Sequence, residues 1–269
     1  MDNDRKAAAT TGNTTYNALF IRGAKLTVRN NNRKLAVEFH DQDRDKILYK
    51  TVISETETWA ACYISYFVNW RIVAKTPDGE VVFEHRFDCR DKRVFFPIIS
   101  RCLGDTLAWI PQIEAFRKKH KCKVVCSSHW NDLLSGGYPQ IEFIGTDETA
   151  TNLYATYDMA WHYDKKGHVN TLKHREDFKS LPLTASAASI LGLEQKELRP
   201  RLVVPDTARR YPKPYVCFSP HASASAKYWH HPHGWQTVID YLREQLGYDV
   251  VMISKESNTS KRQPVSYTH

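Results

Sequence analysis

The sequence predicts an α/β protein that begins with an antiparallel β region, and three observations support this prediction. Residues 16–93 alternate β-branched or aromatic residues with polar ones, as half-buried strands do. The apolar run at residues 94–99 is followed by a tight turn and a helical pattern. Residues 215–254 then repeat the order of strand, loop and helix and end in a further strand.

The N-terminal part of the chain divides into two segments. Residues 1–15 are polar and without pattern, so we expect a disordered start. Residues 16–93 predict a small antiparallel sheet or barrel, in which "TPDGE" marks a hairpin turn. Such a β domain could recognise an acceptor, assist assembly or act as a structural cap, and its sequence favours none of these roles.

Residues 94–195 predict a first α/β domain. After the strand at 94–99, the helix pattern places Leu107, Ile110, Ile113 and Phe116 on one face. "CKVVCSS" and "QIEFIG" are typical of short buried strands, "HWNDLLSGG" of a helical connection, and "LPLTASAASILGL" of a helix that a glycine ends. The proline-rich segment 196–213 is interpreted as a linker.

Residues 214–256 predict part of a second α/β domain. A short strand enters a loop of small residues, and a periodic helix and another strand follow. A small-residue loop before a helix is a common phosphate-binding arrangement. Because such domains usually need about 130–150 residues, we expect this one to be incomplete. Residues 257–269, "SNTSKRQPVSYTH", lack a hydrophobic period and are interpreted as an aberrant tail.

Composition limits the classes of function. The chain has 269 residues and a net charge of +8, but its basic residues are mixed with acidic ones, so nucleic-acid binding is not favoured. An RNA- or partner-binding module that uses the basic β domain stays an alternative. The chain has neither a run of about 20 apolar residues nor a signal peptide, so we expect a cytoplasmic protein without a membrane span. Its 6 cysteines show no CxxC spacing, which predicts buried thiols and no metal site.

Asp105 is the candidate functional residue of the first α/β domain. It follows a predicted strand and lies near the start of a predicted helix, where open α/β sheets hold ligands and a carboxylate is stabilised. A purely structural role as the N-cap of that helix is equally consistent with the spacing.

Two segments resemble one enzyme family. "LGDTLAWIPQIEAF" is similar to the first glycine–aspartate loop of the ADP-heptose-dependent lipopolysaccharide heptosyltransferases, and "FSPHASASAKYWHHPHGWQTVIDYL" is similar to a segment of their second domain. The added N-terminal β region resembles that of the autotransporter protein O-heptosyltransferases within this group. The resemblance implies a GT-B fold, in which two Rossmann-like domains face each other. The second domain would be incomplete here, and the antiparallel β domain would precede both.

The resemblance also implies the reaction. Heptose would pass from ADP-heptose to a serine hydroxyl of an autotransporter passenger protein, with inversion and without a required divalent metal. Members of the family form homo-oligomers and hold structural iron in a cysteine cluster, which has no counterpart in this sequence. A catalytically inactive fragment that binds a nucleotide sugar is the alternative.

The resemblance assigns roles to individual residues. Asp105 would be the general base, and Lys227 would neutralise the charge of the departing ADP. The other residues expected to contact the donor are Gly104, Thr106, Leu107, Ser223, Ser225, Trp229 and Glu256.

Overall fold

The computed structural model describes residues 8–11, 13–54, 58–203, 211–222 and 225–253. The chain forms two compact units, unit 1 (Met1–Val203) and unit 2 (Val204–His269). The boundary between them falls within the segment that we interpreted as a linker.

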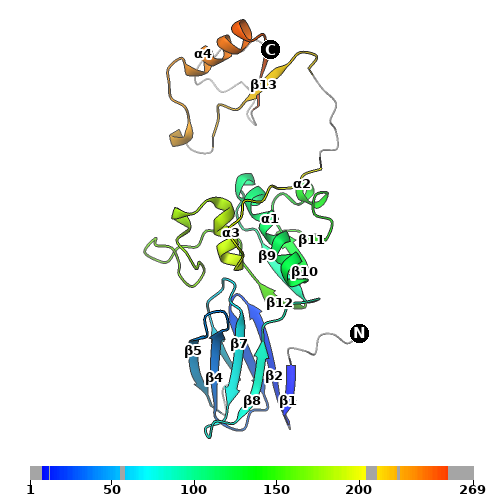
Figure 1. Ribbon diagram of the computed structural model, residues 1–269, viewed down its shortest axis with the longest axis vertical. Coiled ribbons are helices and arrows are strands. Elements are labelled where there is room, and N and C mark those ends of the chain that lie inside the picture. Colours follow the sequence, from blue (N-terminus) through cyan, green and yellow to red (C-terminus); the bar gives the residue numbers. More distant parts are fainter. Residues whose placement is uncertain (1–7, 12, 55–57, 204–210, 223–224, 254–269) are drawn as a thin grey trace. The chain divides into compact units, whose positions relative to one another are not determined.

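Unit 1 contains a mixed sheet of 8 strands (Figure 1). A parallel part is followed by antiparallel strands: β3 and β1 pair antiparallel with β2, and β6 pairs antiparallel with β3. The strand order is β11 (Ile141–Ile144), β10 (Lys123–Ser127), β9 (Arg93–Pro97), β12 (Leu153–Thr156), β2 (Thr14–Ile21), β3 (Ala24–Arg29) and β6 (Trp59–Cys62), with β1 (Ala8–Thr11) beside β2.

A second sheet of unit 1 has 4 antiparallel strands. Their order is β5 (Lys46–Ile53), β4 (Leu35–Asp41), β7 (Trp70–Lys75) and β8 (Val81–Arg86). The expected hairpin at "TPDGE" joins β7 and β8, where the Gly79 amide donates to the Thr76 carbonyl over 3.0 Å. The antiparallel character expected for residues 16–93 is therefore present.

Two features differ from the sequence-based expectations. The mixed sheet runs across the predicted domain boundary at residues 93 and 94, because β12 pairs in parallel with the end of β2 at Phe20 and Ile21. Residues 8–11, expected to be disordered, form β1. A strand at the edge of a sheet is held by backbone hydrogen bonds, so it needs no hydrophobic pattern.

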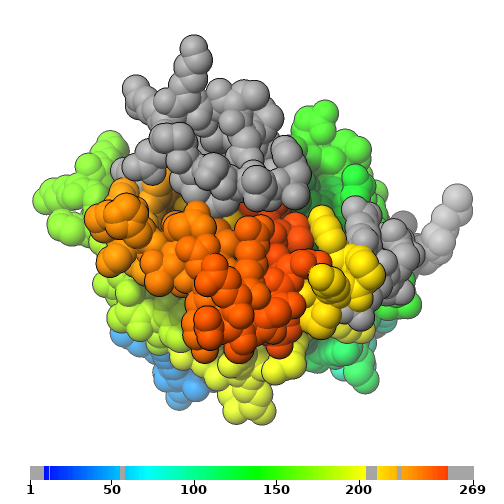
Figure 2. Space-filling model, turned by 90° about the horizontal axis from the view of Figure 1, so that it is seen from above, coloured from blue at the N-terminus to red at the C-terminus, as the bar shows by residue number. Residues whose placement is uncertain are grey.

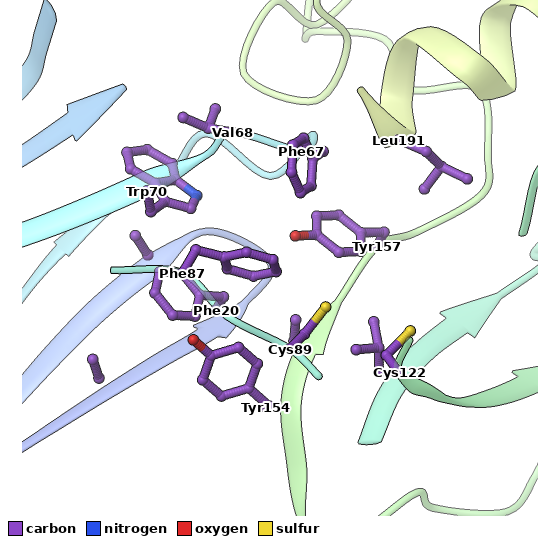
Figure 3. Close-up of a cluster of buried hydrophobic side chains, with 14 of the residues drawn as sticks. Phe20, Phe67, Val68, Trp70, Phe87, Cys89, Cys122, Tyr154, Tyr157 and Leu191 are labelled. Carbon is purple, nitrogen blue, oxygen red and sulfur yellow. The ribbon is translucent and has the colours of Figure 1, made fainter. Parts of the chain in front are cut away.

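An aromatic core joins the two sheets (Figure 3). Phe20, Phe67, Phe87, Tyr154 and Tyr157 lie close together in the interior. The ring of Phe87 lies 5.0 Å from that of Phe20 and 5.5 Å from that of Phe67, both edge to face. Aromatic pairs in this geometry add to the stabilisation from burial. The N-terminal strands and the parallel sheet thus share one interior.

Two helices pack side by side on the parallel part of the sheet (Figure 1). They are α1 (Leu103–His120) and α3 (Leu183–Leu191), and a short helix, α2 (Asn131–Ser135), follows β10. Ile110, Ile113 and Phe116 of α1 are fully buried, as the helical period predicts. Trp109 is buried as well, and its Nε1 donates to the Leu183 carbonyl over 3.2 Å. This bond ties α1 to the first turn of α3.

Unit 2 contains the predicted strand–helix–strand arrangement. Strands β13 (Tyr215–Phe218) and β14 (Asp249–Met252) pair in parallel. The helix between them, α4 (Gly234–Asp240), continues as a π-helical segment, η4 (Tyr241–Gln245), and a 3₁₀ turn, η3 (Ser225–Lys227), precedes it. Among the described residues of both units, no helix has the length and apolar composition that a membrane span requires.

A ladder of ion pairs crosses the second sheet of unit 1 at Glu38. The Nζ atoms of Lys50 on β5 and Lys75 on β7 each lie 2.9 Å from a carboxylate oxygen of Glu38 on β4. The side chain of Glu38 is 5% exposed. The hydrogen bond from Lys75, supported by that from Lys50 and opposed by burial, lowers the pKa of Glu38 to about 2.

Replacement of Glu38 by Gln is expected to destabilise unit 1 more at neutral pH than in acid. A carboxyl group whose pKa is lowered in the folded state stabilises the fold above its unfolded pKa, and this stabilisation is lost as the pH falls toward 2. Because both lysines are partly exposed, we expect a difference of about 1–2 kcal/mol at pH 7. Urea unfolding of the original protein and of Glu38→Gln at pH 7 and at pH 3 measures the difference in unfolding free energy. An equal difference at both pH values would show that the ion pairs of Glu38 do not stabilise the fold.

Candidate active site

The loops that follow the parallel strands of unit 1 define a candidate site. Strands β2, β12, β9, β10 and β11 run in the same direction, so their carboxyl ends share one edge of the sheet. This edge is where open α/β sheets bind ligands. The loop after β9 leads into α1, and Asp105 is the third residue of that helix.

Asp105 lies in the first turn of α1 and is half-buried. Its Oδ2 atom accepts a hydrogen bond from Ser100 Oγ over 2.5 Å and another from Trp161 Nε1 over 3.2 Å. The N-cap residue of α1 is Cys102, which makes no side-chain capping bond. The alternative that Asp105 is simply the N-cap is therefore wrong, because the helix begins two residues before it.

The neighbours of Asp105 in α1 are oriented differently. Thr106 is fully buried, and both its backbone N–H and its Oγ1 donate to the Cys102 carbonyl over 3.3 Å. Its amide is thus engaged within the helix and does not point at a ligand. Leu107 is partly buried and packs against the core, and Gly104 is exposed. The amides of an α-helix that lack an intrahelical acceptor are those of its first turn, here residues 103–105.

Sequence reasoning missed two residues of this edge, Ser100 and Trp161. Trp161 follows β12 and is 56 positions from Asp105. Its ring packs against Trp109 and Phe178, at centroid distances of 5.0 Å and 4.8 Å. Loops that follow neighbouring parallel strands meet at one edge of the sheet, and this rule could have placed Trp161 near Asp105. The sequence did not reveal that β12 lies beside β9, so the rule could not be applied.

A second carboxylate on the same edge is already paired. Asp158 follows β12, and its two oxygens lie 2.9 Å and 2.8 Å from Nε of Arg22, which follows β2. The side chain of Asp158 is 8% exposed. This ion pair links the ends of two adjacent parallel strands, and Arg22 Nε contacts both oxygens of Asp158.

Two histidines that follow Trp161 in the chain, His162 and His174, lie near each other, with ring centroids 5.6 Å apart. The His162 amide donates to Nε2 of His174 over 3.0 Å, so this nitrogen is an acceptor. Burial lowers the pKa of His162, and it lowers the pKa of His174 to about 4. We therefore expect His174 to be uncharged at neutral pH. The described residues contain no group of three or more His, Cys, Asp or Glu side chains arranged to hold a metal ion.

Unit 2 carries the second set of predicted site residues. Lys227 ends η3 and is exposed, seven positions before the first residue of α4. Trp229 is 48% exposed, and its ring lies 5.2 Å from that of Trp235. The residues from η3 to β14 form the orange and red surface in Figure 2. Ser223 and Glu256 lie outside the described residues, and of Ser225 only the backbone is described.

Comparison with known proteins identifies relatives by sequence. No family model matches the chain. It is 31% identical over 229 residues to the autotransporter heptosyltransferase TibC of Escherichia coli O78:H11, a match that covers 84% of this chain and 54% of TibC. It is 32% identical over 227 residues to the autotransporter heptosyltransferase Aah of Escherichia coli, covering 82% of this chain and 56% of Aah. BimC of Burkholderia thailandensis, named an inactive autotransporter heptosyltransferase, is 31% identical over 66% of this chain and 42% of its own length.

Solved structures agree with this relationship. The crystal structure of TibC in complex with ADP-D-β-D-heptose, described as dodecameric and iron-containing, matches with a TM-score of 0.82 and 30% sequence identity. The match covers 95% of this chain and 65% of the TibC chain. The chain thus spans about half the length of the curated relatives, 54% for TibC. Over the matched residues, the chain belongs to the family of autotransporter heptosyltransferases.

Proposed function

We propose that the chain is the acceptor-side unit and part of the donor-side unit of a glycosyltransferase. The enzyme would transfer heptose from ADP-heptose to serine hydroxyls of an autotransporter protein, with inversion at the sugar. The observation that supports this proposal is the carboxylate of Asp105, held by Ser100 and Trp161 at the carboxyl edge of the parallel sheet. A fixed carboxylate at this edge is suited to accept the proton of an attacking hydroxyl.

The inverting reaction assigns opposite tasks to the two units. Asp105 would act on the acceptor hydroxyl, on the sugar face opposite the leaving diphosphate. Lys227 and Trp229 of unit 2 would contact the ADP side, in the arrangement known as GT-B. The first-turn amides of α1, including that of Gly104, are better placed for a ligand than the amide of Thr106, which is bonded to Cys102. Leu107 would contribute packing beneath the loop, and Ser223, Ser225 and Glu256 stay predictions.

The buried cysteines of unit 1 do not fit an iron site, although the TibC structures are described as iron-containing. Cys89 and Cys122 lie near each other in the apolar interior of unit 1 (Figure 3). The neighbouring Cys122 and burial raise the pKa of Cys89, and burial raises the pKa of Cys126. Metal ligation requires thiolates, which these surroundings disfavour. We therefore assign no step to iron. We also propose that the protein forms a homo-oligomer, which the dodecameric TibC supports. A cytoplasmic location is part of the same proposal.

The proposal is tested directly with the purified chain, ADP-heptose and an autotransporter passenger protein. We expect calorimetry to show binding of ADP-heptose, and intact-mass spectrometry to show addition of heptose residues to the passenger. Peptide mapping should place the sugar on serine. Binding without transfer would support the second candidate below, and the absence of both would overturn the proposal.

Replacement of Lys227 by Ala is expected to weaken ADP-heptose binding and to slow transfer. The charge that Lys227 would neutralise is present on the bound diphosphate and grows as ADP departs, so both steps should suffer. We expect a loss of affinity of about tenfold, measured by calorimetry. Lys213, an exposed lysine before β13, is the matched control. An unchanged dissociation constant and rate in Lys227→Ala would remove this residue from the donor site.

A second candidate is a protein that binds the nucleotide sugar without transferring it. Kinship with BimC, a relative named inactive, favours this candidate. It predicts ADP-heptose binding that depends on Lys227 and no transfer at any enzyme concentration. In this candidate Asp105 has no chemical role. A passenger protein whose mass is unchanged after incubation with the chain and ADP-heptose would distinguish the binding protein from the proposed transferase.

A further inference from the structure

The two hydrogen bonds that described residues donate to the side chain of Asp105 end on the same oxygen. Ser100 Oγ and Trp161 Nε1 both donate to Oδ2. Asp158, the other carboxylate of this edge, differs because Arg22 engages both of its oxygens. Asp105 is therefore anchored at one oxygen and presents the other, Oδ1, for a further partner.

The two donors are themselves fixed by their surroundings. Ser100 Oγ accepts a hydrogen bond from the Cys102 amide over 3.1 Å, so its own proton is directed to Asp105. The ring of Trp161 is held between Trp109, which is fully buried, and Phe178. These contacts restrict the rotation of the indole and thereby the direction of its N–H. A catalytic group that is held by neighbours with locked rotamers needs little reorganisation during the reaction.

We propose that Ser100 and Trp161 are positioning residues that hold Oδ2 of Asp105, so that Oδ1 is the oxygen that receives the acceptor proton. This inference rests on the proposed function, because it specifies how the same base is oriented. In the reaction, the acceptor hydroxyl transfers its proton to Oδ1 while its oxygen forms a bond to the anomeric carbon of heptose. The bond from that carbon to the diphosphate oxygen breaks, and ADP leaves with the electron pair.

Replacement of Trp161 by Phe tests the indole N–H separately from the ring. Phe keeps an aromatic side chain between Trp109 and Phe178 but removes the donor to Oδ2. We expect kcat to fall about tenfold, with the KM for ADP-heptose unchanged. Ser100→Ala should have the same effect, and Ser100→Thr, which restores a hydroxyl, should recover most of the rate. Trp130→Phe is the matched control, since its Nε1 donates to the Arg101 carbonyl and not to Asp105.

Indole resonances provide a readout that does not depend on turnover. In ¹H–¹⁵N spectra, Trp161→Phe and Trp130→Phe assign the two signals. Loss of a charged acceptor shifts a donor proton upfield, so Asp105→Ala should move the Trp161 signal and leave the Trp130 signal in place. A Trp161 signal that stays unchanged in Asp105→Ala, or a Trp161→Phe enzyme with normal kcat, would overturn the inference. If the unsubstituted chain transfers no heptose, the proposed function fails, and the indole spectra alone decide whether Trp161 holds Asp105.

Discussion

Replacement of Asp105 by Asn is expected to slow heptose transfer by about 10²–10⁴-fold, the usual contribution of a general base. Asn is nearly isosteric and can still accept hydrogen bonds from Ser100 and Trp161 through its amide oxygen, so the loop should keep its geometry. It cannot take a proton from the acceptor. Because Asp105 acts on the acceptor rather than on the nucleotide, the affinity for ADP-heptose should stay within about twofold of the original value.

The matched control for this substitution is Asp158→Asn. Asp158 lies on the same edge of the sheet, but it is paired with Arg22 and its side chain is only 8% exposed, so it is poorly accessible to an acceptor. We expect transfer by Asp158→Asn to change only slightly, because Arg22 is half-exposed and solvent weakens its interaction with Asp158. Initial rates at saturating ADP-heptose, together with calorimetric dissociation constants, measure both variants. Turnover by Asp105→Asn within a few-fold of the original rate would eliminate Asp105 as the base.

Local structure in this chain was predictable because periodicity reports which face of an element is buried. Ile110, Ile113 and Phe116 recur at helical spacing and are fully buried in α1. The apolar period of residues 235–246 locates the helical segment of unit 2, but of its apolar residues Ile239 is buried whereas Val238 and Leu246 are exposed. These predictions depend only on neighbours in sequence.

The partner of each strand was not predictable in the same way. A period of two identifies a strand but not the strand beside it, so the pairing of β12 with β2 was missed. This pairing makes the antiparallel strands continuous with the parallel sheet and brings Arg22 to Asp158. The contact between Trp161 and Asp105 was missed for the same reason, since it depends on β12 lying beside β9. The sequence thus identified the candidate base but not the residues that hold it.

Replacement of Gly192 by Ala is expected to destabilise unit 1 by about 3–4 kcal/mol, the sum of left-handed backbone strain and overpacking. Gly192 ends α3 with φ +62°, and a Cβ atom there would lie 2.2 Å from Cδ1 of Phe67. Phe67 cannot easily move away, because its ring is 5.5 Å from that of Phe87 and 5.7 Å from that of Phe116. Urea unfolding followed by circular dichroism measures the loss.

Gly167→Ala separates the two causes of this loss. Gly167 has a similar φ of +80°, but a Cβ atom there would have no neighbour within 4 Å. It should therefore cost only the backbone strain, about 1–2 kcal/mol. Equal losses in the two variants would show that Phe67 does not block the Cβ atom. We also expect Gly192→Ala to disturb the candidate site. The Leu183 carbonyl of α3 accepts a hydrogen bond from Trp109, and Trp109 packs against Trp161.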